Sequence, residues 1–163
     1  MSHASHSAHY RTGSGGYGNR AAGRLLAALT ALFALRVAAQ VIQFCAPLSF
    51  LPPFAAFQGS DLPYGVLLSS QLAILMVMIG VTSRVRWGAL RRSARAARVL
   101  AAVGGVYLAG SLARLVVGVT VPDAGPWMSA SIPAFFHIVL AAFVLGHAAY
   151  HAGGRGRPVE VSS

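Results

Sequence analysis

The sequence has few charged residues, and nearly all of them are arginines. Charged residues make up 10% of the 163 positions, whereas a soluble domain carries about 25%. Lysine is absent, and Asp61, Asp123 and Glu160 stand against 13 arginines, which leaves a formal net charge of +10. Because 56% of the residues are hydrophobic, charged side chains cannot cover a soluble surface. The composition excludes a soluble enzyme and an intrinsically disordered protein.

Cysteine and catalytic motifs are scarce as well. Cys45 is the only cysteine, so the chain can form neither an internal disulfide nor a dithiol redox couple. The sequence has no glycine-rich phosphate loop and no arguable Ser-His-Asp set, and nothing in it singles out a nucleophile. These absences leave an integral membrane protein, and they favour a non-catalytic role over an enzyme.

Long apolar stretches are what the sequence does contain. Four of them, each of about 19–23 residues, are long enough to cross about 30 Å of hydrocarbon as helices. They cover residues 25–45, 65–83, 99–121 and 132–150. We therefore predict an all-α integral membrane four-helix bundle within residues 21–151. Residues 1–20 are predicted to be a disordered cytoplasmic tail, and residues 152–163 a second cytoplasmic tail.

The arginines predict the orientation of the chain in the membrane. Eleven of the 13 lie outside the apolar stretches, in the two terminal flanks and in the connection between the second and third stretches. The other two connections contain no arginine, and each carries one aspartate. By the positive-inside rule, both termini and the middle connection are cytoplasmic. We expect the protein in the cytoplasmic membrane of a bacterium.

The middle connection is short and strongly basic. It carries Arg84, Arg86, Arg91, Arg92, Arg95 and Arg98. Its place between two spans favours contact with anionic lipid headgroups, at about 1 kcal/mol per basic residue near the surface, over binding of nucleic acid. An alternative is that these arginines only set the topology. Membrane lipids are thus the expected partners, and both a homo-oligomer and partner membrane subunits stay open.

The two halves of the chain resemble each other weakly. The first and third stretches each contain one arginine, Arg36 and Arg114, and the second and fourth each begin near a proline, Pro63 and Pro133. Proline suits the first turn of a helix, where its missing N–H costs nothing. The chain is therefore interpreted either as two duplicated two-helix units or as two unrelated hairpins.

Polar side chains inside the spans predict a site. Such groups are costly in lipid and usually mark a cavity or a pathway. The candidate ligand-binding residues are Arg36, Gln40, Gln71, Tyr107, Arg114 and His137. In the first and third spans, polar residues recur at i, i+4 and i+7, which places them on one helix face. Counted along the helices, most of them lie roughly 8–15 Å beneath the outer surface, so we expect one shared pocket that opens outward.

The charge of this pocket suggests its ligand. The spans contain two arginines and no carboxylate, and an unpaired buried guanidinium is expensive. The sequence therefore predicts an anionic or amphiphilic ligand such as a lipid headgroup, because the planar guanidinium fork suits phosphate and carboxylate. In the alternative, Arg36 and Arg114 pair with Asp61 and Asp123 of the outer loops, or extend toward the surface, and serve only to hold the bundle together.

Two further patterns bear on how the pocket is enclosed. The first outer loop, residues 46–64, is rich in aromatic residues and proline, which predicts either a lid over the pocket or a segment in the headgroup layer. The third span carries a ladder of small residues that lets helix backbones approach closely. The ladder consists of Ala101, Gly105, Ala109 and Ala113. We interpret it as internal packing rather than as an oligomer seam.

Cofactor chemistry is an alternative from another class of function. His137 and His151 are 14 positions apart on the fourth span, a spacing that two stacked haems could use. Each haem normally needs a second axial ligand from another helix, so haem would have to be shared with a partner subunit. His137 beside Gln71 could instead serve a quinone. For His147 and His151 we prefer interfacial histidines over a metal site, and we predict no metal.

The third span also carries a resemblance. Residues 110–114 (GSLAR), Gly118 and residues 123–126 (DAGP) resemble the arginine-bearing third span of small four-helix bacterial membrane families such as the DoxX-like proteins. We carry no function over from it. The leading hypothesis is a non-catalytic or accessory membrane subunit with an outward-facing polar pocket. An oxidoreductase component and a small transporter are the alternatives.

Overall fold

The chain folds into helices of the length that a membrane requires. The computed structural model describes residues 14–58, 62–121 and 131–153. The four long helices are α1 (Ser14–Cys45), α3 (Tyr64–Arg86), α4 (Ala94–Thr120) and α6 (Ser131–Ala152), and a short helix, α2 (Phe54–Gln58), lies between α1 and α3. All four are long and apolar enough to span a bilayer. The predicted all-α membrane four-helix bundle is confirmed.

The helices extend beyond the apolar stretches that predicted them. A helix satisfies its own backbone hydrogen bonds, so it can continue from hydrocarbon into polar flanks. Residues 14–20 of the predicted disordered tail are therefore part of α1, while the rest of that tail and residues 154–163 lie outside the described residues. Gly88, with a φ of 68°, allows the turn after α3 because glycine lacks a Cβ that would clash there.

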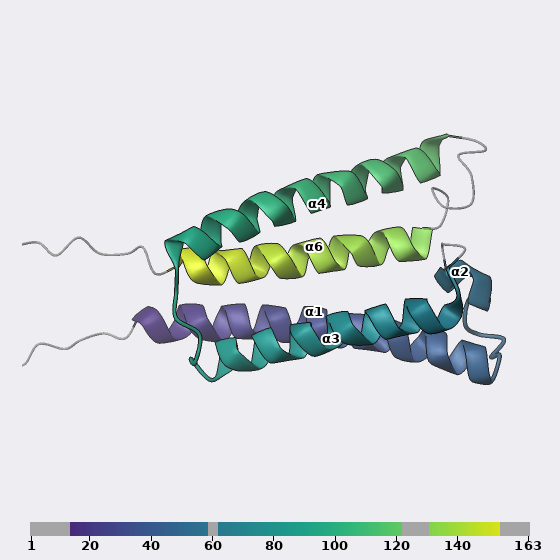
Figure 1. The fold of residues 1–163 in the computed structure, drawn as a ribbon, viewed down its shortest axis with the longest axis horizontal. Coiled ribbons are helices and arrows are strands. Elements are labelled where there is room, and N and C mark those ends of the chain that lie inside the picture. Colours follow the sequence, from purple (N-terminus) through teal and green to yellow (C-terminus); the bar gives the residue numbers. More distant parts are fainter. Residues whose placement is uncertain (1–13, 59–61, 122–130, 154–163) are drawn as a thin grey trace, which may run out of the picture.

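The four long helices lie in a row rather than in a closed square. α4 packs along α6, α6 against α1, and α1 against α3, whereas α3 and α4 make no extensive contact (Figure 1). The two central helices are accordingly the more buried. Within an apolar stretch of 18 residues in each helix, 39% of the residues are buried in α6 and 33% in α1, against 17% in α3 and in α4. Sequential helices thus pair as two hairpins, which matches the predicted division into two-helix units.

The apolar core lies between the central helices and α3. It is built from Leu26, Phe33, Val37, Met78, Val85, Phe143 and Tyr150. α4 adds no large side chain to this cluster and instead approaches α6 closely at Gly104. A Cβ at Gly104 would lie 2.9 Å from Cδ2 of Leu145, so only glycine fits there without a shift. The contact between α4 and α6 depends on this close approach.

The prediction that the small-residue ladder packs internally is wrong. Ala101, Gly105, Ala109 and Ala113 are all exposed, and nothing lies within 4 Å of a Cβ built at Gly105. The buried stripe of α4 consists instead of Ala97, Gly104, Ser111 and Arg114. Polar groups avoid lipid and turn toward protein, so the hydroxyl and the guanidinium determine which face of α4 meets α6.

The described arginines gather at one end of the bundle. We call this the arginine-rich end; it contains the start of α1, the end of α3, the start of α4 and the end of α6 (Figure 1). The opposite end, which we call the α2 end, contains α2. Of the arginines within the described residues, only Arg36 and Arg114 lie away from the arginine-rich end.

Candidate functional site

Arg36 is the centre of the polar site at the α2 end. Its side chain is only 7% exposed, and its charge meets neutral partners. Nη1 donates to Oε1 of Gln40 over 3.1 Å, and Nη2 donates to the backbone carbonyl of Phe57 over 3.0 Å. The guanidinium carbon lies 5.4 Å from the centroid of the Phe136 ring, a cation–π geometry. Its Nε–H has no hydrogen-bond partner among the described residues.

Gln40 connects Arg36 to the neighbouring helix. It is fully buried, and its Oε1 also accepts a hydrogen bond from Nε2 of Gln71 on α3 over 3.2 Å. Nε2 of Gln40 and Oε1 of Gln71 have no partner within the described part of the chain. The group formed by Arg36, Gln40 and Gln71 can therefore make further hydrogen bonds. Making them would be favourable, because a buried polar atom without a partner costs free energy. Two of these buried atoms, Nε of Arg36 and Nε2 of Gln40, are hydrogen-bond donors.

The short helix α2 covers this group. Phe57, whose carbonyl accepts from Arg36, is 5% exposed, and α2 contacts both α1 and α6. Oε1 of Gln43 accepts the backbone N–H of Leu48 over 3.0 Å, which holds the start of the loop against α1. The described residues 46–58 therefore lie partly over the site, as the lid interpretation predicts, while Phe50, 78% exposed, suits the headgroup layer.

An aromatic cluster supports α2 from the outside. Phe44, Phe54 and Tyr64 are in mutual ring contact, with centroids 4.3–5.4 Å apart. Such ring pairs add about 0.5–1.5 kcal/mol beyond the area they bury. The cluster joins the end of α1, the start of α2 and the start of α3, so α2 is fastened to the bundle at its edge as well as through Arg36.

A second polar group lies between α4 and α6. The Tyr107 hydroxyl is hydrogen-bonded to Nδ1 of His137, and the two rings are perpendicular. The Ser111 hydroxyl donates to the carbonyl of Tyr107 over 2.7 Å. Arg114 is 8% exposed and interacts electrostatically with Tyr107 and His137. These contacts place the candidates of the third and fourth spans in one cluster.

His137 relates the two polar groups to each other. It lies within electrostatic reach of both Arg36 and Arg114, and its neighbour Phe136 contacts Arg36. The six candidate residues therefore form two adjacent groups on either side of the central helix α6. The described part of the chain provides no carboxylate to either group, since Asp61, Asp123 and Glu160 fall outside it. The predicted alternative in which Asp61 and Asp123 pair with the arginines thus lies outside the described residues.

Sequence reasoning missed two partners of Arg36. The Phe57 acceptor is a backbone carbonyl, which every residue carries, so no side-chain pattern could reveal it. In the sequence, Phe136 looks like one more apolar residue of a span.

A further polar contact joins α1 and α3, where the Thr30 and Thr82 hydroxyls are hydrogen-bonded to each other over 3.1 Å. Thr30 itself donates to the Leu26 carbonyl, which is an ordinary bond within a helix.

The histidines at the arginine-rich end serve a different purpose. Nδ1 of His151 accepts the backbone N–H of Ser93 over 3.1 Å, so the proton of the neutral ring is on Nε2. That nitrogen lies 3.2 Å from Nε2 of His147 and donates to it. The Tyr150 hydroxyl donates to the carbonyl of Leu90 over 2.8 Å. The end of α6 thereby holds the connection between α3 and α4.

Comparison with known proteins adds no assignment. No family model matches the chain, and neither does any curated protein or solved structure.

Proposed function

We propose that the protein is a non-catalytic or accessory membrane subunit that holds an anionic or amphiphilic ligand at Arg36. The observation that carries this proposal is the environment of the guanidinium. It is buried among neutral acceptors, and the described segments offer no partner to the donors Nε of Arg36 and Nε2 of Gln40. A buried cation is strongly stabilised by a counter-charge that also completes its hydrogen bonds.

The ligand chemistry follows from the donors. Arginine presents a planar fork that binds carboxylate or phosphate through two parallel N–H groups. The Phe57 carbonyl and the Gln40 amide oxygen occupy the outer ends of the fork, and Nε is buried, so an anion reaches the guanidinium by displacing Phe57. Displacement would move α2, which makes α2 the segment that responds to the ligand. Phe136 and the aromatic cluster suit an apolar portion of an amphiphile.

The test compares Arg36→Met with a neighbouring control. R36M keeps the length of the side chain without charge, and an apolar replacement of similar volume usually preserves the fold of a buried ionic site. Leu35→Met is the control, because Leu35 is 66% exposed. We expect an anionic or amphiphilic species to co-purify with the wild type and L35M in native mass spectrometry, and to be lost from folded R36M. Equal retention by R36M overturns the proposal.

One observation favours a second candidate, an oxidoreductase component. The half-buried Tyr107–His137 pair is a hydrogen-bond donor and acceptor set that could hold a quinone carbonyl. The described histidines all lie on α6, so a haem would need a second axial ligand from a partner subunit. A redox-active absorbance band in the purified wild type that is lost in Tyr107→Phe and His137→Gln would favour this candidate over the first.

A further inference from the structure

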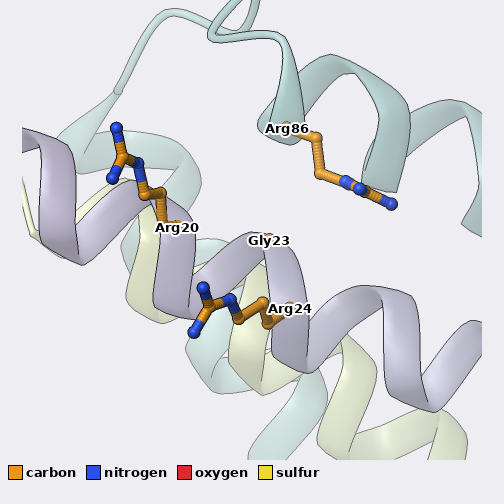
Figure 2. A pocket seen from close by; sticks show the side chains of 4 residues that line it. All are labelled: Arg20, Gly23, Arg24 and Arg86. Carbon is orange, nitrogen blue, oxygen red and sulfur yellow. The ribbon is translucent and has the colours of Figure 1, made fainter.

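A cavity at the arginine-rich end brings together arginines from two helices. It has a volume of about 260 Å³ and is lined by Arg20, Gly23 and Arg24 of α1 and Arg86 of α3. Arg20 and Arg24 lie one turn apart on α1 and line the same space as Arg86 of α3, whose guanidinium points away from the other two (Figure 2). No described residue is acidic, so the three arginines that line the cavity have no protein counter-charge from the described segments.

Gly23 shapes the wall between the helices. It is buried and faces Arg86, and a Cβ built on it would lie 3.0 Å from Cγ of Arg86. The glycine therefore lets the stem of Arg86 pass close to the backbone of α1. A larger residue at this position would push the stem away or fill the space between the arginines. The cavity thus depends on the combination of a small residue and three long basic ones.

The position of the cavity indicates where its ligand comes from. Arg20 begins the apolar span of α1, and Arg86 ends that of α3, so the cavity lies at the depth of lipid headgroups. Trp87 follows directly and is 83% exposed, as aromatic residues of the membrane interface are. The volume is below the roughly 300–1,000 Å³ of pockets for drug-sized ligands, which suits a headgroup whose acyl chains remain in the bilayer.

We propose that this cavity binds the phosphate of an anionic phospholipid headgroup through Arg20, Arg24 and Arg86. Guanidinium groups bind phosphate oxygens with paired, charge-assisted hydrogen bonds, and basic pockets between membrane helices are suited to anionic headgroups. Binding draws together three side chains that repel one another in its absence. The site lies at the opposite end from Arg36, so it stands or falls independently of the proposed function.

The test is a lipid titration of the detergent-purified protein by native mass spectrometry. Arg86→Gln removes one lining charge, and Arg20→Gln/Arg24→Gln removes two. The matched control is Arg84→Gln, which removes the same charge from the same helix but does not line the cavity. We expect phosphatidylglycerol affinity to fall about fivefold for each lining arginine removed, and less than about twofold in R84Q because Arg84 does not line the cavity and acts on the bound phosphate only from a distance.

Four further results decide the proposal. Gly23→Leu keeps every charge and fills the cavity, so folded G23L should lose phosphatidylglycerol binding; wild-type affinity in G23L would place the lipid elsewhere. Phosphatidylcholine should bind more weakly than phosphatidylglycerol, and equal binding would show that charge is not recognised. Displacement of the lipid by equimolar inorganic phosphate would identify a site for a soluble anion instead. A loss in R84Q as large as in R86Q would reduce the effect to general surface charge and overturn the proposal.

Discussion

The two ends of the bundle use arginine in opposite ways. At the α2 end, Arg36 is 7% exposed and is held by an amide oxygen, a backbone carbonyl and an aromatic ring. At the other end, Arg20, Arg24 and Arg86 are exposed at the rim of a cavity. The same side chain is thus an interior structural element at one end and a surface group at the other.

This difference shows that the burial of an arginine, rather than its residue type, determines whether its surroundings point to a ligand. An exposed arginine at a span end is explained by topology and headgroup charge alone. A buried one must be compensated by its surroundings, so the atoms around Arg36 restrict which ligand it could accept. The hypothesis of a ligand at Arg36 and that of a lipid at the rim therefore need different kinds of experiment.

The largest expected difference between the ends concerns access from the two sides of the membrane. Cys45 ends α1 at the α2 end and is exposed. The predicted orientation places it outside, so a membrane-impermeant maleimide should label the wild type in intact cells. In Cys45→Ser/Trp87→Cys the only thiol lies at the arginine-rich end, and labelling should require lysis. Unreactive C45S provides the blank, and the reverse pattern of labelling would invert the orientation.

The next largest difference concerns stability. Gln40→Leu removes the acceptor shared by Arg36 and Gln71 and leaves a buried cation less compensated. Hydrogen bonds between membrane helices are individually worth about 0.6–1.7 kcal/mol, so Q40L should lower the free energy of unfolding by about 1–3 kcal/mol. Arg20→Leu should change it by less than about 0.5 kcal/mol. Denaturant unfolding in detergent measures both, and equal effects would remove the distinction between the ends.

Much of the fold could be predicted because the membrane restricts it. Apolar stretches of sufficient length must become helices in lipid, and the four long helices lie where the stretches predicted them. The order of packing could not be predicted in this way. Hydropathy does not say that α6 lies beside both α1 and α4 while α3 and α4 stay apart. That arrangement depends on which face of each helix is buried.

The candidate site, like the fold, could be predicted from the sequence only in part. The i, i+4 spacing placed Arg36 and Gln40 on one face, and both are buried and hydrogen-bonded to each other. In α4 the same reasoning located Ser111 and Arg114, yet the small-residue ladder suggested a different face, and the polar face is the buried one. A regular spacing identifies residues that share a face, but the direction of that face is set by the neighbouring helix. The Phe57 carbonyl has no sequence pattern at all.

The smallest effect is expected from the polar contacts that fasten the arginine-rich end. Tyr150→Phe removes only the hydroxyl that donates to the Leu90 carbonyl and keeps the ring, which packs in the core and under Arg92. We expect Y150F to lower the free energy of unfolding by about 0.5–1 kcal/mol, less than Q40L, because no charge depends on this bond. It should also raise amide hydrogen exchange in the connection between α3 and α4. If Y150F instead destabilises the protein as much as Q40L, the arginine-rich end is fastened as firmly as the α2 end, and burial of a charge is not what distinguishes them.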